Sequence, residues 1–220
     1  MRQTGIFYGI GVGPGDPELM TLKAVRKIRE CEIIVLPISD RELTEPMLLE
    51  QNGKENKALK YLEGCTAYQI AVQAVPEIEK KQILFLPMPM IKDKKVLRKI
   101  HAKGAETIGQ FLEQGYSIAF LTLGDPTVYS TCMYVEQMIE QQGYPVETVS
   151  GIPSFCAAAA RLNQPLGEQE DQIHILPGSY EAGEGIQLPG TKILMKTGRK
   201  MGQIKELLRE SGQDICLIEN

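Results

Sequence analysis

The amino-acid sequence predicts an α/β protein made of two α/β domains with a cleft between them. Short, wholly apolar runs such as 33–36 alternate along the chain with longer segments of helical periodicity. Loops rich in Gly, Asp and Pro follow several of these runs directly and lead into the helices. A polar stretch without periodicity, 163–171, separates a long first part from a shorter second part.

The first domain is expected to span 1–162. Continuous apolar runs are typical of parallel strands that are buried on both faces, and apolar residues three or four apart are typical of amphipathic helices. Strands are predicted at 6–11, 33–36, 83–86, 118–123 and 146–149, and helices at 18–30, 92–114, 129–142 and 153–162. The alternation of strand and helix predicts an open, mostly parallel sheet.

Two segments of this domain carry finer expectations. Asp16 is placed to cap the first helix and Pro17 to open it, with the apolar face formed by Leu19, Leu22, Val25 and Ile28. Residues 39–66 are polar and irregular, with a turn at 51–54 and a helix around 57–62.

The stretch 163–171 is interpreted as a linker, and 172–220 as a C-terminal α/β domain. Strands are predicted at 173–176, 192–195 and 215–218, with a helix from about 202 to 211. We expect this second domain to be incomplete and to continue beyond Asn220, because a sheet rarely ends uncovered on its last strand.

Composition excludes several classes of protein. Lys and Arg total 24 against 28 Asp and Glu, and this net charge of −4 argues against nucleic acid as the main partner. No apolar run approaches the roughly 20 residues of a membrane span, and no signal peptide is recognisable. The five cysteines are scattered, which favours free thiols in the cytoplasm. With two histidines, a histidine-rich metal site is not expected.

Three loops stand out as candidate ligand-binding segments: 11–17, 124–131 and 150–154. Each follows a predicted strand and opens a helix, so each lies at the carboxyl edge of the sheet, where α/β proteins bind small ligands. The plain alternative is that they are only helix starts with capping residues. The first loop is a poor dinucleotide fingerprint, because Pro14 has no amide N–H and Asp16 stands at the third glycine position.

These motifs resemble the tetrapyrrole methyltransferases, the S-adenosylmethionine enzymes of cobalamin and sirohaem synthesis. The resemblance rests on G-x-G-P-G-D-P-E-L-x-T-L-K-A at 11–24, G-D-P-T-V-Y-S-T at 124–131, S-G-I-P-S-F at 150–155, I-L-P-G at 175–178 and L-M-K-T-G-R at 194–199. The second and last of these look most like the branch that methylates C20 of precorrin-2 or of its cobalt complex, cobalt-factor II.

The resemblance implies an S-adenosylmethionine-dependent C-methyltransferase of corrin biosynthesis, with the donor at the domain junction and the macrocycle above it. The donor contacts that it implies are Pro14, Leu123, Gly124, Asp125, Val128, Pro153, Ser154 and Met195. The first glycine loop, through Gly13, Gly15 and Asp16, is expected to face the tetrapyrrole. No metal ion is expected to be bound by protein side chains, and a homodimer is expected.

Basic residues are the candidates for binding the carboxylates of the substrate, with a solvated helix face as the alternative. They are Lys92, Lys94 and Arg98 in the first domain and Lys196 and Arg199 in the second. Tyr129 is the candidate catalytic side chain, with a packed aromatic as the alternative, and no catalytic base is assigned.

Other functions stay open from the sequence. Relatives that methylate uroporphyrinogen III carry an Asp at the end of the second strand, where this chain has Leu36-Pro37, so that role does not transfer. A methyltransferase of the same fold could still act on uroporphyrinogen III or at another corrin position. A non-catalytic nucleotide-binding module is the alternative from a different class.

Overall fold

The computed structural model describes residues 4–49, 56–178, 183–211 and 215–218. The chain divides into two compact units, Met1–Ser154 and Phe155–Asn220, and each is described by itself. Both units combine strands with helices, which confirms the predicted α/β class. The expected domain limits, 1–162 and 172–220 around a linker, stay a prediction.

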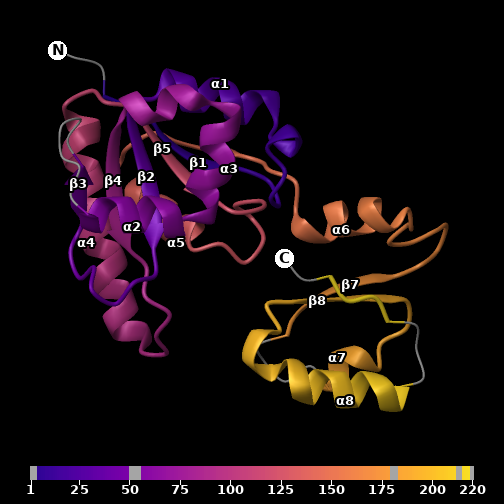
Figure 1. Ribbon diagram of the computed structural model, residues 1–220. Helices are drawn as coiled ribbons and strands as arrows, with labels where there is room; N and C mark the ends of the chain where they lie inside the picture. Colours follow the sequence, from indigo (N-terminus) through magenta and orange to yellow (C-terminus); the bar gives the residue numbers. More distant parts are fainter. Residues whose placement is uncertain (1–3, 50–55, 179–182, 212–214, 219–220) are drawn as a thin grey trace. The chain divides into compact units, whose positions relative to one another are not determined.

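The first unit is built on a six-stranded sheet with the order β3-β4-β2-β5-β1-β6 (Figure 1). All neighbouring strands are parallel except β3, which pairs with β4 antiparallel at the edge. Its strands are β1 (Phe7–Gly11), β2 (Ile33–Ile38), β3 (Met47–Leu49), β4 (Gln82–Pro87), β5 (Ile118–Thr122) and β6 (Val146–Val149). Its helices are η1 (Pro17–Leu19), α1 (Leu22–Glu30), α2 (Asn56–Gly64), α3 (Thr66–Ala74), η2 (Pro76–Lys80), α4 (Lys94–Glu113) and α5 (Cys132–Gln141), η marking short 3-10 helices.

Helices cover both faces of this sheet, which explains why its strands are apolar without alternation. Ile34 and Leu36 of β2 pack in a core with α1, α2 and α3, whereas Ile33 and Val35 pack in a second core with α4 and α5. All four side chains are fully buried.

The connections of β1 and β5 leave the sheet toward opposite faces. The chain after β1 enters α1 on one face, and the chain after β5 enters α5 on the other. Because β1 and β5 are neighbours, this is the topological switch point, and α/β proteins bind ligands at such points, outside the carboxyl ends of the strands.

The helix predicted at 18–30 is interrupted, and one expected core residue is wrong. Asp16 caps only η1, and α1 restarts after Thr21, whose Oγ1 accepts a hydrogen bond from the Ala24 N–H at 3.1 Å. The interruption changes the phase of the helix, so Leu22, predicted inward, is 90% exposed.

Other elements of the first unit also differ from the prediction. The helix α3 and the short strand β3 were not predicted, and the predicted turn at 51–54 lies outside the described residues. The helix predicted from 129 begins at Cys132 instead, because Tyr129 has a φ of 49° that no α-helix accommodates.

The second unit has a two-stranded parallel sheet of β7 (Ile173–Pro177) and β8 (Thr191–Met195). Its helices are α6 (Ser154–Leu162), which starts on the last residue of the first unit, α7 (Gly183–Ile186), η3 (Gly198–Lys200) and α8 (Met201–Ser211). The strand predicted at 215–218 is wrong: these residues pair with no strand in the described part of the chain, and Leu217 is 65% exposed.

No helix among the described residues is long and apolar enough to cross a membrane.

Candidate functional site

Three loops meet at the carboxyl edge of the first sheet: the β1 loop (12–16), the β5 loop (123–131) and the β6 loop (150–153). The first two are joined by backbone pairing between Gly13 and Gly124. The Gly124 N–H donates to the Gly13 oxygen at 2.8 Å, and the Gly13 N–H donates to the Gly124 oxygen at 3.2 Å. Both residues have positive φ, 80° and 70°, which glycine adopts at little cost.

Two further glycines let the loops pack directly on the sheet. A Cβ on Gly11, the last residue of β1, would lie 2.5 Å from the Gly124 oxygen and 2.7 Å from the Gly151 nitrogen. A Cβ on Gly151 would overlap the same Gly124 oxygen and the backbone of Gly11. Side chains at either position would therefore force the β5 and β6 loops apart.

Asp125 ties the β5 loop to the β6 loop. One carboxylate oxygen, Oδ1, accepts from the Thr127 N–H at 2.8 Å and from the Thr127 hydroxyl at 2.5 Å. The other, Oδ2, accepts from the Gly151 N–H at 3.0 Å. The side chain of Asp125 is 8% exposed, so the carboxylate is nearly withdrawn from water and satisfied by protein donors.

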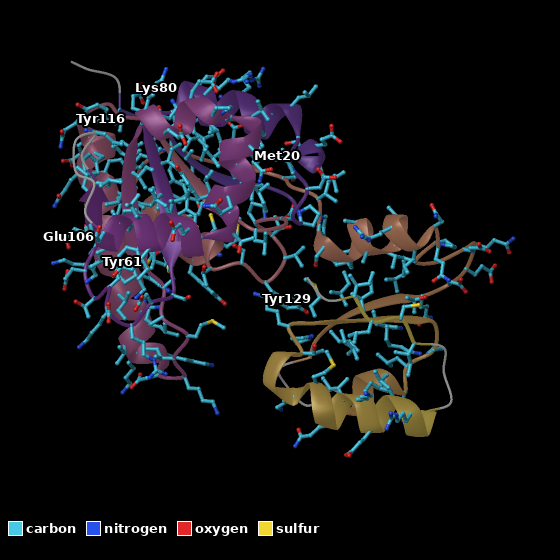
Figure 2. The ribbon with its side chains drawn as sticks, viewed as in Figure 1. Met20, Tyr61, Lys80, Glu106, Tyr116 and Tyr129 are labelled. Atoms are coloured by element: carbon cyan, nitrogen blue, oxygen red, sulfur yellow. The ribbon has the colours of Figure 1, made fainter. Side chains whose placement is uncertain are left out.

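The far end of the β5 loop is held by Ser130. Its hydroxyl lies 2.9 Å from the Thr122 hydroxyl at the end of β5 and accepts from the Cys132 N–H at 3.1 Å. Between Ser130 and Asp125 lies Tyr129, an aromatic residue with left-handed φ and a side chain that is 41% exposed (Figure 2). Such strained residues are typical of functional sites.

Among the expected donor contacts of the first unit, exposure differs. Gly124 is buried as a residue, yet among the described residues no atom beyond its two chain neighbours lies within 4 Å of where its Cβ would be, so open space faces its backbone. Leu123 is 51% exposed although it is apolar, and Ser154 is exposed at the start of α6. Pro14, Val128 and Pro153 are half-buried.

The β1 loop offers less side-chain chemistry. Asp16 is exposed, and its Oδ1 accepts from the Glu18 N–H at 2.8 Å as the cap of η1. Gly15 is half-buried with a φ of 148°, and Gly13 is buried, so Asp16 is the one residue of this loop with a polar side chain exposed to solvent.

The basic candidates of the first unit lie at the beginning of α4. Lys92, Lys94 and Arg98 are exposed, and Asp93 caps the helix by accepting from the N–H groups of Lys95 and Val96. Because α4 follows β4, its N-terminus lies on the carboxyl side of the sheet, as the three loops do.

The candidates of the second unit follow β8. Lys196 has a φ of 59°, a second strained residue directly after a strand, and partial burial lowers the pKa of its ammonium group. Met195 is half-buried, and its carbonyl oxygen accepts from the Gly178 N–H at 2.7 Å. Arg199 lies in η3; its side chain is outside the described part of the structure.

The buried thiol next to the β5 loop is unsuited to nucleophilic chemistry. Burial raises the pKa of Cys132 well above its usual value, and the neighbouring Glu136 carboxyl raises it further. The thiol therefore stays protonated, which disfavours a nucleophilic role.

The structure thus gathers Gly13, Gly124 and Asp125 into one arrangement, with the half-buried Pro153 two residues beyond Gly151. Within the described residues, no hydrogen bond or ion pair joins Lys92, Lys94 or Arg98 to these loops. Sequence reasoning missed the close-approach glycines Gly11 and Gly151. Their only signal was a glycine at the end of an apolar strand and another directly after one.

Comparison with known proteins points to one family. Residues 7–220 match the family model of the tetrapyrrole (corrin/porphyrin) methylases. A probable cobalt-precorrin-2 C(20)-methyltransferase of Methanocaldococcus jannaschii is 36% identical over 86% of this chain and 71% of its own length. A precorrin-2 C(20)-methyltransferase of Sinorhizobium sp. is 26% identical over 95% of this chain and 80% of its own.

One solved structure shows the same fold. It is a uroporphyrin-III C-methyl transferase of Thermus thermophilus complexed with S-adenyl homocysteine. It superposes with a TM-score of 0.57 at 21% identity, covering 96% of this chain and 74% of that chain.

Proposed function

The chain belongs to the tetrapyrrole (corrin/porphyrin) methylases, and from this premise we propose that it methylates C20 of precorrin-2 or of its cobalt complex, with S-adenosylmethionine as the donor. The observation that carries the position of methylation is that both curated relatives described above are named for C20. The β5-loop motif 124–131 supports the same branch.

The residues present fit a donor of this kind. Open space faces the backbone of Gly124, where a side chain would otherwise stand, and the apolar Leu123 beside it is exposed. Such a surface suits an adenosyl group with a few polar attachments. We propose that the donor contacts are Pro14, Leu123, Gly124, Asp125, Val128, Pro153, Ser154 and Met195.

The reaction depends more on how the chain positions the donor and the acceptor than on acid–base side chains. When bound, S-adenosylmethionine supplies a methyl group already activated by its sulfonium, and C20 of the reduced macrocycle is the carbon nucleophile. The β1, β5 and β6 loops hold the donor in one orientation and exclude water from it, which is proximity catalysis. Tyr129 stays the candidate side chain at the reacting centre, because its strained backbone leaves the phenol partly exposed.

The acceptor is a polycarboxylate, which we propose is bound by basic residues and by the β1 loop. The basic residues are Lys92, Lys94, Arg98, Lys196 and Arg199, and the loop residues are Gly13, Gly15 and Asp16. The four cations Lys94, Lys95, Arg98 and Lys99 lie in the first two turns of α4, where the helix dipole favours negative charge instead. An anionic ligand would compensate this unfavourable arrangement.

We also propose that the protein is a homodimer of the cytoplasm. All five cysteines are free thiols, which suits a reducing compartment.

The decisive experiment locates the transferred methyl group. The protein is incubated with isotopically labelled S-adenosylmethionine and, in separate reactions, precorrin-2, its cobalt complex and uroporphyrinogen III. We expect label at C20 with one of the first two acceptors. Label on uroporphyrinogen III, or at another ring carbon, would replace this function by the neighbouring one in the family.

The same preparation tests the non-catalytic alternative. A methyltransferase should bind S-adenosylhomocysteine in preference to NAD. Binding of NAD alone, without methyl transfer to any acceptor, would support a nucleotide-binding module.

A further inference from the structure

The carboxylate of Asp125 is unusual among the loop residues because it bridges two strand ends that are not adjacent. Its own loop follows β5, and its partner Gly151 follows β6, with β1 lying between these two strands. The bridge therefore passes over the end of β1, where Gly11 leaves room for it.

Both oxygens of this carboxylate are engaged by the protein. Oδ1 accepts two hydrogen bonds from Thr127, and Oδ2 accepts the Gly151 N–H. Hydrogen bonds to a buried carboxylate are stronger than neutral ones, so they fix the distance between the loops. Gly124, directly before Asp125, and Pro153, two residues after Gly151, are both proposed donor contacts.

We infer that Asp125 is a positioning residue for the methyl donor: its carboxylate locks the β5 loop onto the β6 loop and so holds the two halves of the donor site at one spacing. This rests on the proposed function. It assigns the carboxylate a task different from direct contact with the donor, which the loop backbone and the neighbouring apolar side chains provide.

The substitution Asp125→Asn tests the bridge with a minimal change in shape. The amide oxygen can still accept from Thr127, but its NH2 group then faces the Gly151 N–H, and two donors oppose each other. We expect the affinity for S-adenosylhomocysteine, measured by calorimetry, to fall about tenfold or more, because a buried donor loses its charged acceptor. The KM for the donor should rise more than that for the acceptor.

Glu32→Gln is the matched control. Glu32 also joins two strand ends through a carboxylate, at the opposite edge of the sheet, where its Oε2 accepts the Ser117 N–H at 2.8 Å; it is exposed, and the two strands are neighbours. This variant should lower the melting temperature somewhat and leave S-adenosylhomocysteine binding unchanged. A purely structural role for Asp125 would make the two variants alike, with lower melting temperatures and wild-type affinity, and would overturn the inference.

A double-mutant cycle separates positioning from direct contact. Gly151→Ala displaces the β6 loop through its Cβ without touching the carboxylate. If Asp125 acts through Gly151, the losses of affinity in Asp125→Asn and Gly151→Ala will not add in the double variant. Additive losses would mean that the carboxylate contacts the donor itself, which would overturn the positioning role.

Thr127→Val keeps the inference testable if Asp125→Asn does not fold. It removes the hydroxyl donor to Oδ1 and leaves the Thr127 N–H, so a smaller loss of affinity is expected. Unchanged affinity in this variant would count against the bridge. Failure of the wild-type protein to bind S-adenosylhomocysteine would instead refute the proposed function.

Discussion

At the scale of single residues, Gly124 is the position where the site most clearly requires glycine. Its φ of 70° is favourable only for glycine, its N–H and carbonyl pair with Gly13, and open space lies on its Cβ side. In the part of the chain that the structure describes, a Cβ there would meet no atom beyond its chain neighbours, so its effect on a ligand can be separated from its effect on packing.

We predict that Gly124→Val lowers the affinity for S-adenosylhomocysteine while the protein still folds. The left-handed backbone should cost about 1–2 kcal/mol of stability, and the side chain would occupy the space proposed for the donor. Calorimetry and thermal unfolding measure the two effects. Gly143→Val is the control, since Gly143 also has a positive φ, 88°. Among the described residues no atom beyond its chain neighbours lies within 4 Å of its Cβ position, and it follows the C-terminal end of α5, whereas the β5 loop precedes the other end. Equal affinities in the two variants would refute this placement of the donor.

Glu136 of α5 is a second residue whose environment has a measurable effect, here on the pH dependence of stability. It is 6% exposed; Oε1 accepts from the Thr148 hydroxyl, and Oε2 has no hydrogen-bond partner within the described residues. Burial raises the pKa of this carboxyl above 4.5, Glu140 adds to the rise, and the Thr148 hydrogen bond opposes it. The fold therefore favours the protonated acid.

The sign of the pH dependence follows from this raised pKa. The stability that protonated Glu136 contributes is fully present below about pH 4.5, its pKa in the unfolded chain, and is lost as the pH rises through the higher pKa of the folded state. We predict that Glu136→Gln is more stable than the wild type at neutral pH and that the difference vanishes in acid. Chemical unfolding across pH measures it, with the exposed Glu106→Gln on α4 as control (Figure 2). A constant difference at all pH values would contradict the prediction.

At the scale of elements, the cations at the beginning of α4 favour the binding of an anionic ligand. The helix runs for 20 residues from the carboxyl edge of the sheet, and its first two turns carry cations where its dipole is positive. A solvated face remains the alternative reading, because every one of these side chains is exposed.

We predict that binding of the tetrapyrrole weakens with added salt while binding of the donor does not. Each exposed ionic contact should contribute roughly 0.2–1 kcal/mol, and such contacts are screened by salt. The Michaelis constants for both substrates across a salt series test this. Replacing Lys94 and Arg98 together by Gln should flatten the salt dependence, whereas Arg26→Gln on α1 should not. Equal salt dependence for the two substrates would indicate that the basic residues of α4 form only a solvated helix face.

At the scale of the whole molecule, apolar side chains remain on the outside of the first unit. Leu22 of α1 is 90% exposed, and Tyr134 of α5 is 56% exposed. Single exposed apolar residues are ordinary, but two-fold dimers are the commonest soluble oligomers, and such residues are typical of their interfaces.

We predict a homodimer at micromolar concentration. Light scattering should give twice the mass of one 24.4 kDa chain. A Leu22→Ser variant that stays dimeric would locate the interface elsewhere, and a wild-type mass of one chain would refute the dimer.

The sequence by itself determined the α/β class, the five parallel strands of the main sheet and the identity of the three loops. It did so because buried parallel strands, amphipathic helices and glycine-rich turns each leave a local pattern. The β6 strand, Val146–Val149, was predicted with the bounds that the structure has. The family resemblance, carried by the loop motifs, was confirmed by the family match.

Only the tertiary structure decided how these loops are joined. Three features of the site depend on strand order, which joins residues far apart in the chain. They are the hydrogen bond between Asp125 and Gly151, the space that Gly11 leaves for both loops, and the positive φ of Tyr129. The failures have two causes, a local helix cap in one case and a missing partner strand in the other. Leu22 is exposed instead of buried, because the helix begins again after Thr21. Residues 215–218 form no strand, because a strand requires a neighbour to pair with. Local pattern specifies which element a segment prefers, and only packing between distant segments specifies which of those elements meet.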